Sequence, residues 1–576
     1  MPNNDVIPES SDQILGDNNI SGSGSLYATS QMRLAWDRDS VIRRATEDYI
    51  KALPKPVTLS SEELRNGLTN AIIDAIIERN AVQGGTKVQT IQSLPNPCVA
   101  ALILAKYHVR CISWTGNRDD GNYVGVYQED GNEEGIYINS DAYFNQLIRE
   151  FKYTATKKDV DEILEILEAD APFVKPCRDQ DLIAVNNGII NYKTKQLFPF
   201  DPDICFTAKS KVNYVTGPPP VNPHIVMPDG VVWDFDSWMK SLSDDSDIVD
   251  LLLKSCGAVL RPNVRWDRII GLFGSQGMNG KGTLCELMKQ LCGEGSYASI
   301  PIVDFAKDSK LVQLVHANAV ICDENGTNDY AKDVANLKAL TTGDDISIDR
   351  KYKEAITFKY SGLIVQCLND WIRVGDQSPS WMRRILPIEM SKSFQGEERK
   401  YIKQDYLHRP EVLEYVLWKV MNLPDYYELP EPDACKKLLA EYKEYNDPVV
   451  QFVEDVFPEL VWEKVPQSFV YDLYLKWCHK NNPSGKLIGR NGVVDRIRQY
   501  VRSNYSDVWM FKAEKVCINN KDNLEPELMI VEYGLDDWRS KTYKGTDPAK
   551  MSMPKFKSSY KGVFVKIGNN DDDNEN

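Results

Sequence analysis

The stretch that decides the fold is Ile269-Ile-Gly-Leu-Phe-Gly-Ser-Gln-Gly-Met-Asn-Gly-Lys-Gly-Thr-Leu284. It predicts a strand over 269–273, a glycine-rich turn over 274–280 and a helix that begins near Gly282. In a phosphate-binding loop, backbone N–H groups converge at a helix N-terminus and a lysine reaches the β- and γ-phosphates. We therefore expect a nucleotide site here, with Lys281 as the phosphate-binding lysine.

The loop departs from the usual pattern at two positions. Ser275 stands where the pattern places its first glycine, with Gly274 one residue earlier. Gly282 stands where a serine or threonine hydroxyl ordinarily ligates Mg²⁺, and Thr283 is the nearest substitute, directly or through a water. The alternative is a purely structural turn, which the strand–loop–helix context disfavours. The predicted nucleotide-binding residues are Ser275, Gly277, Asn279, Gly280, Lys281, Gly282 and Thr283.

A second apolar run, Ala319–Cys322, ends in the carboxylates Asp323 and Glu324. Paired carboxylates at a strand end suit metal binding and water activation. We expect Asp323, with Thr283, to hold Mg²⁺, and Glu324 to polarise the attacking water. The alternative is a strand that ends in solvated charge, and the position of the pair about 40 residues after the loop lysine disfavours it.

Three further motifs follow in order. They are the segment 336–353 (NLKALTTGDDISIDRKYK), the strand-like run 363–368 ending in Asn369, and Ser380-Trp-Met-Arg-Arg-Ile385. Together with the loop and the acidic pair, they resemble the superfamily 3 helicases, in particular the helicase half of the phage, plasmid and poxvirus primase–helicases. The resemblance covers about residues 180 to 390 and includes the stretch 185–191 (VNNGIIN).

This resemblance implies an AAA+-type P-loop ATPase core that uses ATP and Mg²⁺ and assembles into a ring, expected to be a hexamer. It implies a DNA helicase of phage or mobile-element replication that translocates on single-stranded DNA in the ring channel. Asn369 corresponds to the sensor that positions the attacking water or reports the γ-phosphate. Arg383 or Arg384 corresponds to an arginine finger that acts on the neighbouring subunit's site. The sequence does not decide between these two arginines.

The alternating stretch from Ile346 to Phe358 predicts a hairpin whose turn carries Arg350, Lys351 and Lys353. In a ring, such hairpins would hold a phosphate backbone by charge with little sequence preference. A net charge of −16 does not favour a broad basic surface, but a channel can confine its basic residues. The alternative is a solvated turn.

The carboxyl-terminal region predicts a helix over 470–478 and a second over 489–502. It resembles the winged-helix module that often ends members of this family. The second helix carries three arginines away from its apolar face, which would contact duplex DNA. The alternative is a solvated basic face. These arginines are Arg496, Arg498 and Arg502.

The expected fold class is α/β, with an α+β amino-terminal region before the ATPase core and a winged-helix-like domain after it. The expected divisions are a disordered tail (1–29), a small helical unit (30–90), a helicase-associated α+β domain (91–245), the ATPase core (246–400), a helical connection (401–446), the winged-helix-like domain (447–545) and a disordered tail (546–576).

Composition narrows the possible classes of protein further. The sequence contains no run of 18 or more uncharged apolar residues, so we expect no membrane span. The polar first thirty residues show no signal-peptide pattern, so we expect a cytoplasmic protein. The 12 cysteines include no Cys-x-x-Cys pair, which disfavours a zinc ribbon or a disulfide framework. About 90 residues before the helicase-associated region are too few for a primase domain. We expect no priming by this chain and a separate primase or polymerase partner.

Three other functions stay open. The first is an origin-binding or loading protein in which ATP controls assembly without unwinding. The second is a small nucleotide kinase, some of which carry the same Gly-Lys-Gly-Thr sequence, although no acceptor lid is evident. The third is a structural or interaction protein with an inactive nucleotide fold.

Overall fold

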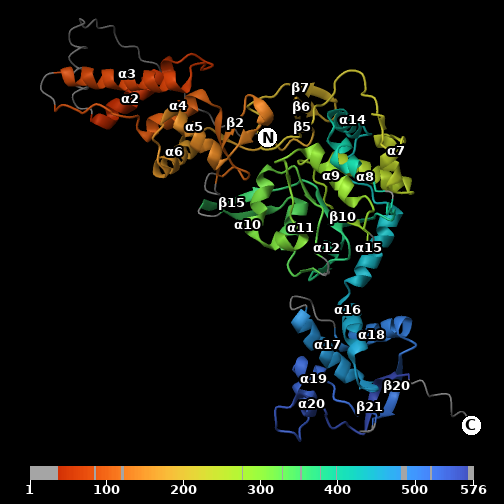
Figure 1. Cartoon of the computed structure of the whole chain (residues 1–576). Helices are drawn as coiled ribbons and strands as arrows, with labels where there is room; N and C mark the ends of the chain where they lie inside the picture. The colour runs from red at the N-terminus through yellow and green to blue at the C-terminus, as the bar shows by residue number, and fades with distance from the viewer. Residues whose placement is uncertain are drawn as a thin grey trace, which may run out of the picture. The chain divides into compact units, whose positions relative to one another are not determined.

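The computed structural model describes residues 37–82, 86–117, 122–274, 277–326, 329–350, 353–376, 378–396, 398–481, 489–518 and 522–567. The chain forms two compact units. One comprises residues 1–112, 123–127 and 138–173, and the other comprises the remainder (Figure 1). The expected amino-terminal disordered tail lies outside the described residues.

The first unit is a helical layer on a small antiparallel sheet. One hydrophobic core joins its helices, with Leu68, Val99, Ile148 and Leu167 all fully or almost fully buried. The expected boundary near residue 90 is therefore wrong, because segments on both sides of it fill the same core. The elements are α2 (Arg38–Ala52), α3 (Ser61–Ala81), α4 (Asn96–Lys106), β1 (Val109–Ile112), β2 (Tyr123–Tyr127), α5 (Asp141–Phe151) and α6 (Lys157–Asp170).

The second unit begins with short strands and two helices that lead to the phosphate-binding loop. The stretch 185–191 forms a strand end, a turn and a second strand, since β5 pairs with β6 across a turn that ends at Gly188. Gly188 has φ 147°, and a Cβ there would meet the carbonyl oxygen of Phe198 at 2.3 Å. The elements are β5 (Leu182–Val185), β6 (Gly188–Asn191), β7 (Gln196–Phe198), β8 (Ile225–Val226), β9 (Val232–Trp233), α7 (Phe235–Ser241) and α8 (Ser246–Ala258).

A five-stranded parallel sheet forms the centre of this unit. Its strand order is β11-β12-β16-β10-β18. The strands are short apolar runs because helices and loops cover both faces of the sheet, and the predicted α/β class is confirmed. The strands are β10 (Ile269–Phe273), β11 (Tyr297–Ala298), β12 (Ala319–Cys322), β16 (Ile364–Leu368) and β18 (Ile385–Glu389).

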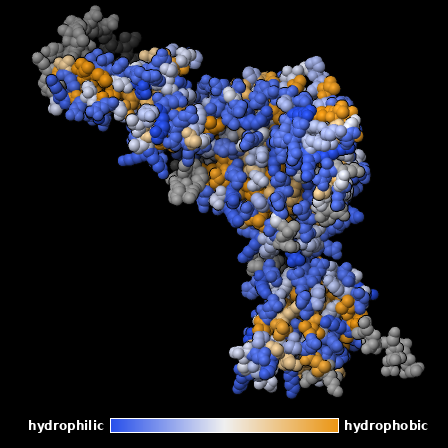
Figure 2. Space-filling view, in the orientation of Figure 1, coloured by the Kyte–Doolittle hydropathy of each residue, from blue (hydrophilic) through white to orange (hydrophobic). Residues whose placement is uncertain are grey.

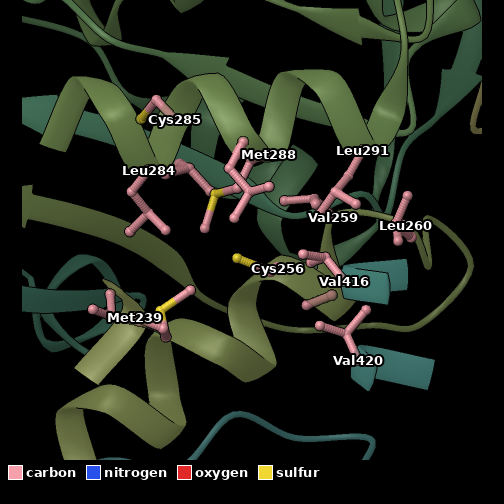
Figure 3. Packing of buried hydrophobic residues seen from close by; sticks show 14 of the residues in the cluster. Met239, Cys256, Val259, Leu260, Leu284, Cys285, Met288, Leu291, Val416 and Val420 are labelled. Carbon is pink, nitrogen blue, oxygen red and sulfur yellow. The ribbon is translucent and has the colours of Figure 1, made fainter. Parts of the chain in front are cut away.

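Helix α9 (Lys281–Cys292) carries the loop lysine at its first residue and is fixed on two sides. Figure 3 shows Leu284 and Met288 pointing toward Cys256 of α8, among residues that include Val416 of α14 (Pro410–Met421). The opposite face carries Cys285, whose sulfur lies 3.2 Å from that of Cys367 on β16. Burial on both faces holds the helix start rigidly against the sheet.

Between β12 and β16 the chain adds shorter elements and one longer hairpin. The predicted hairpin is confirmed, with β14 (Asp345–Arg350) antiparallel to β15 (Lys353–Lys359) and Ile346 opposite Phe358. The shorter elements are α10 (Asp308–Leu311), β13 (Tyr330–Ala331), α11 (Ala335–Thr342), β17 (Arg373–Val374) and α12 (Pro379–Met382). The expected helical connection after the sheet contains α13 (Lys400–Gln404), α14 and α15 (Asp433–Tyr445).

The carboxyl-terminal part has its own core of helices packed on a three-stranded antiparallel sheet of order β19-β21-β20. The expectation of a disordered tail from residue 546 is wrong up to residue 567, because β21 is the central strand of this sheet. Its run of β-branched and aromatic residues, Val563-Phe-Val565, with Val563 and Phe564 buried, is the missed signal. The elements are α16 (Pro448–Val456), β19 (Lys464–Pro466), α17 (Gln467–Asn481), α18 (Arg490–Asn504), β20 (Trp509–Cys517), α19 (Met529–Glu532), α20 (Pro548–Met551) and β21 (Ser559–Lys566).

On the face drawn in Figure 2, hydrophilic residues predominate and hydrophobic residues occur in scattered clusters. None of the helices in the described ranges combines the length and hydropathy that a bilayer crossing requires.

Candidate nucleotide site

The predicted catalytic groups follow three neighbouring strands of the parallel sheet. The loop follows β10, the acidic pair follows β12, and Asn369 follows β16, which lies between the other two. Because the strands are parallel, their carboxyl ends meet at one edge, where ligands of open α/β sheets bind. The topology therefore brings together side chains that lie far apart in the sequence.

The loop holds its lysine in a defined position. Gly280 has φ 88° and precedes the first residue of α9, so the chain turns sharply into the helix. The side chain of Lys281 is buried, and Nζ donates to the carbonyl oxygen of Gly274 over 2.6 Å. Burial lowers the pKa of Lys281.

Asn279 and Gly274 fit against each other inside the loop. The Asn279 side chain is 3% exposed, and a Cβ on Gly274 would lie only 2.1 Å from its Nδ2 atom. A glycine is thus required at 274, one residue before the position where the sequence pattern expects one. Gly277 is exposed, and the predicted Ser275 lies outside the described residues.

The acidic pair is accessible at the end of β12. Asp323 and Glu324 are both exposed, but Asp323 Oδ1 lies 3.0 Å from Nζ of Lys289 on α9. Burial would raise the pKa of Asp323, yet the hydrogen bond and the charge of Lys289 outweigh it and the pKa is lowered. The sequence did not single out Lys289. The feature that could have identified it is its position eight residues after Lys281, because a spacing of about two helical turns places both lysines on the same side of the helix.

A buried amide also supports the acidic pair. Asn325 is 7% exposed, and its Nδ2 donates to Gln366 Oε1 and to the carbonyl of Cys367, both at 3.0 Å. Its Oδ1 accepts from the backbone N–H of Ile302 at 3.0 Å. These bonds fix the backbone after Glu324 against β16. The missed signal is a glutamine, Gln366, in the middle of an otherwise apolar strand.

Asn369 is exposed immediately after β16. The backbone N–H of Gly274 donates to the carbonyl of Leu368 at 3.1 Å, so the start of the loop lies beside the residue that precedes Asn369. The ring of Phe273, which ends β10, stacks on Trp371 with centroids 4.2 Å apart. These two contacts hold the end of β16 next to the loop. The aromatic contact was not predicted.

The structure separates the two arginines that the sequence left undecided. Arg384 is 7% exposed, and its guanidinium donates to the carbonyl and the hydroxyl of Ser380 at 2.5 and 2.6 Å. Arg383 is exposed, and its own carbonyl accepts from Arg268. Arg384 therefore stabilises its own turn, while the side chain of Arg383 is the one that another molecule can reach.

The expected Mg²⁺ site at Thr283 and Asp323 can be tested against the donors present. Gly282 supplies no hydroxyl, and the ammonium of Lys403 lies 3.5 Å from the position a Cβ of residue 282 would take. Asp323 is engaged by Lys289. Mg²⁺ prefers oxygen ligands from carboxylates and phosphates. The two lysines near the single carboxylate would repel a metal ion placed there. These residues do not fit a directly ligated Mg²⁺ ion.

A cavity of about 500 Å³ opens beside the loop. Gly280 and Thr283, at the start of α9, line the cavity on one side. The aromatic rings of Trp238 and Phe394 form another part of its wall. The remaining wall joins apolar side chains, such as Trp233 and Leu242, to charged side chains on and just before α13, among them Arg399, Lys400 and Lys403. A cleft that combines apolar wall with charged groups, next to a phosphate-binding loop, has the size and character of a nucleotide pocket.

The predicted DNA-binding residues have different surroundings. Two of the three predicted arginines on α18 are paired, Arg496 with Asp447 and Arg498 with Asp495 at 3.1 Å. Arg502 is exposed. Lys351 and the side chains of Arg350 and Lys353 lie outside the described residues, although the strands that lead to them are described.

Three family models match the chain. The D5 N terminal like model matches residues 100–258, the Poxvirus D5 protein-like model matches residues 444–540, and a family of unknown function (DUF5906) matches residues 272–384. Two of the three are D5 models. The two D5 matches agree with the resemblance to the poxvirus primase–helicases that the motifs indicate. The DUF5906 match covers the loop, the acidic pair and Asn369.

Similar solved structures include the A form apo structure of the NrS-1 C terminal region, with 15% identity and a TM-score of 0.38, covering 82% of this chain and 99% of that one. The apo structure of NrS-1 C terminal region 305–718 has 14% identity and a TM-score of 0.38, covering 74% and 97%. A JCV helicase with a bound small molecule has 16% identity and a TM-score of 0.23, covering 36% and 58%.

Proposed function

We propose that this protein is an ATP-dependent DNA helicase of the superfamily 3 type, acting in phage or mobile-element replication. The observation that carries the proposal is the convergence of Lys281, Glu324 and Asn369 at one edge of a parallel sheet. The position of the Asn369 strand between the loop strand and the acidic strand supports an AAA+-type core. The D5 family matches support a replicative role.

In the proposed reaction, ATP places its phosphates on the loop, and Lys281 exchanges the Gly274 carbonyl for a β- or γ-phosphate oxygen. Glu324 accepts a proton from a water that attacks the γ-phosphorus, and the bond to the β–γ bridging oxygen breaks to leave ADP and phosphate. Asn369 orients that water. The cavity lined by Trp238 receives the nucleoside.

Arg383 supplies the positive charge that stabilises the transition state in a neighbouring subunit's site. Its exposure beside the buried and bonded Arg384 supports this assignment. Such an arginine acts only if the chains assemble, so the proposal includes a ring, expected to be a hexamer. Single-stranded DNA passes through its channel, held by the turns between β14 and β15.

The carboxyl-terminal domain is proposed to be a winged helix. The order α16, β19, α17, α18, β20, β21, with the short helices α19 and α20 between the last two strands and β21 central in the sheet, supports it. Helix α18 would then face duplex DNA, with the exposed Arg502 at a phosphate and Arg496 and Arg498 drawn from their acidic partners.

One observation favours a second candidate, an origin-binding or loading protein in which ATP controls assembly without unwinding. Asp323 is neutralised by Lys289, and Gly282 lacks a hydroxyl, so slow turnover would be expected. A strand-displacement assay separates the two. The helicase proposal expects wild-type protein to release a labelled strand in the presence of ATP and Lys281→Ala to release none. ATP-dependent assembly on DNA without strand release would favour the second candidate.

A further inference from the structure

Lys403 lies beside the first turn of the loop helix. Its ammonium nitrogen is 3.5 Å from the Cβ position of Gly282, the residue directly after the loop lysine. It also lies near enough to Asp323 for its charge to lower the pKa of that carboxyl. Lys403 thus occupies the neighbourhood where a hydroxyl at residue 282 and its metal ion would ordinarily lie.

The place of Lys403 is fixed by packing. It belongs to the short helix α13, whose Ile402 is 8% exposed and forms part of the main hydrophobic core around α9. Lys403 lines the 500 Å³ cavity together with Gly280 and Thr283. Anchoring by Ile402 places the backbone of Lys403 beside the mouth of the loop.

Several cationic groups gather at the start of α9. A helix N-terminus carries partial positive charge, so a lysine ammonium there is repelled. Within the described residues Lys403 makes no ion pair and no hydrogen bond, and the nearby carboxylate Asp323 is bonded to Lys289 instead. Lys281 adds a further cation at the start of the helix. A polyanion placed between these groups would relieve the repulsion.

Resting on the proposed function, we infer that Lys403 is a further phosphate-binding residue that contacts the ATP polyphosphate and carries charge that Mg²⁺ would otherwise carry. Triphosphate binding should consequently persist when magnesium is removed. In the proposed nucleotide site, Lys403 thus takes the place of the hydroxyl that residue 282 lacks.

The test is a titration of ATP into the full chain, by calorimetry, in magnesium and in EDTA. Wild-type protein is expected to bind in both, with at most a severalfold loss in EDTA. Lys403→Ala should weaken binding about 10- to 100-fold in EDTA, since a hydrogen bond between charged groups is lost. Lys403→Arg should retain most of the affinity, and Lys437→Ala, an exposed lysine on α15, should change nothing.

A double variant sharpens the test. Combining Gly282→Ser with Lys403→Ala restores a hydroxyl and removes the cation, so binding should become strictly magnesium-dependent. Melting curves without nucleotide verify that each variant folds. Unchanged binding by Lys403→Ala in EDTA overturns the inference, and so does complete loss of wild-type binding in EDTA. Absence of wild-type binding in both buffers overturns the proposed function along with it.

Discussion

Nζ of Lys289 lies 3.0 Å from Oδ1 of Asp323. Helix α9 therefore begins with the loop lysine, Lys281, and two turns later carries the lysine that neutralises Asp323. The helix therefore links the phosphate-binding loop to the acidic strand end. Any movement of α9 on nucleotide binding changes the charge environment of Asp323. The ion pair also limits how readily the Asp323 carboxylate can bind another cation.

Removing this pair should cost stability in a pH-dependent way. We expect Lys289→Met to lower the free energy of unfolding by about 1 kcal/mol at pH 7, as partly exposed ion pairs do. The folded-state pKa of Asp323 is lowered, so its stabilisation is present above the ordinary carboxyl pKa and is lost as the pH falls through the lower folded value. Urea unfolding at pH 7 and pH 3 measures the difference between the variant and wild type.

The matched control is Lys436→Met, which removes an exposed pair with Asp433 on α15. It should leave the free energy of unfolding nearly unchanged at either pH, because a fully exposed ion pair contributes little to stability. A Lys289→Met effect that is equally large at both pH values would show that the lysine acts through packing and not through its charge.

The two neighbouring arginines should have separable effects. Arg384→Ala removes two hydrogen bonds to Ser380 and should destabilise the protein by about 1 to 3 kcal/mol. Arg383→Ala should leave the melting temperature unchanged and abolish ATP hydrolysis. Mixing Arg383→Ala with Lys281→Ala chains should recover part of the activity, because each supplies what the other lacks. Failure of any mixture to recover activity would contradict action in trans.

The buried amide at Asn325 should couple stability to activity. Asn325→Ala leaves Gln366 and the Cys367 carbonyl without their partner, so we expect a loss of about 2 to 3 kcal/mol. Since these bonds fix the backbone after Glu324, ATP hydrolysis should fall more than ATP binding. Asn504→Ala, an exposed amide at the end of α18, serves as the control and should change neither.

The hairpin and α18 should bind different forms of DNA. Lys351→Ala with Lys353→Ala should weaken binding of single-stranded DNA and reduce the slope of log K against log salt concentration by roughly 0.7 for each phosphate that is no longer neutralised. Arg502→Ala should weaken duplex binding and leave single-strand binding unchanged. Equal effects of both changes on both forms of DNA would argue for a non-specific charge contribution.

The sequence predicted the parts of the site that follow from local pattern. The strand–loop–helix at 269–284, the acidic end of β12, the β14–β15 hairpin and the asparagine after β16 are each visible as apolar runs with a polar ending. What it missed depends on contacts between distant segments. Lys403 reaches Gly282 only because α13 packs near α9, and no local pattern marks it.

The same reasoning explains the errors at the domain boundaries. A division at residue 90 looked natural from the change in pattern, but segments on both sides contribute to one core. The expected tail from residue 546 contains β21, which gains its stability from pairing with β19 and β20. Burial in a shared core or sheet is a tertiary property, and composition alone does not report it.

The most direct test of the central claim is steady-state ATP hydrolysis, with and without single-stranded DNA, by wild type, Lys281→Ala and Glu324→Gln. The account predicts hydrolysis by wild type that DNA stimulates, no nucleotide binding by Lys281→Ala, and retained binding with roughly a 100-fold or greater loss of turnover for Glu324→Gln. Wild-type protein that binds ATP but does not hydrolyse it, with or without DNA, would contradict the account.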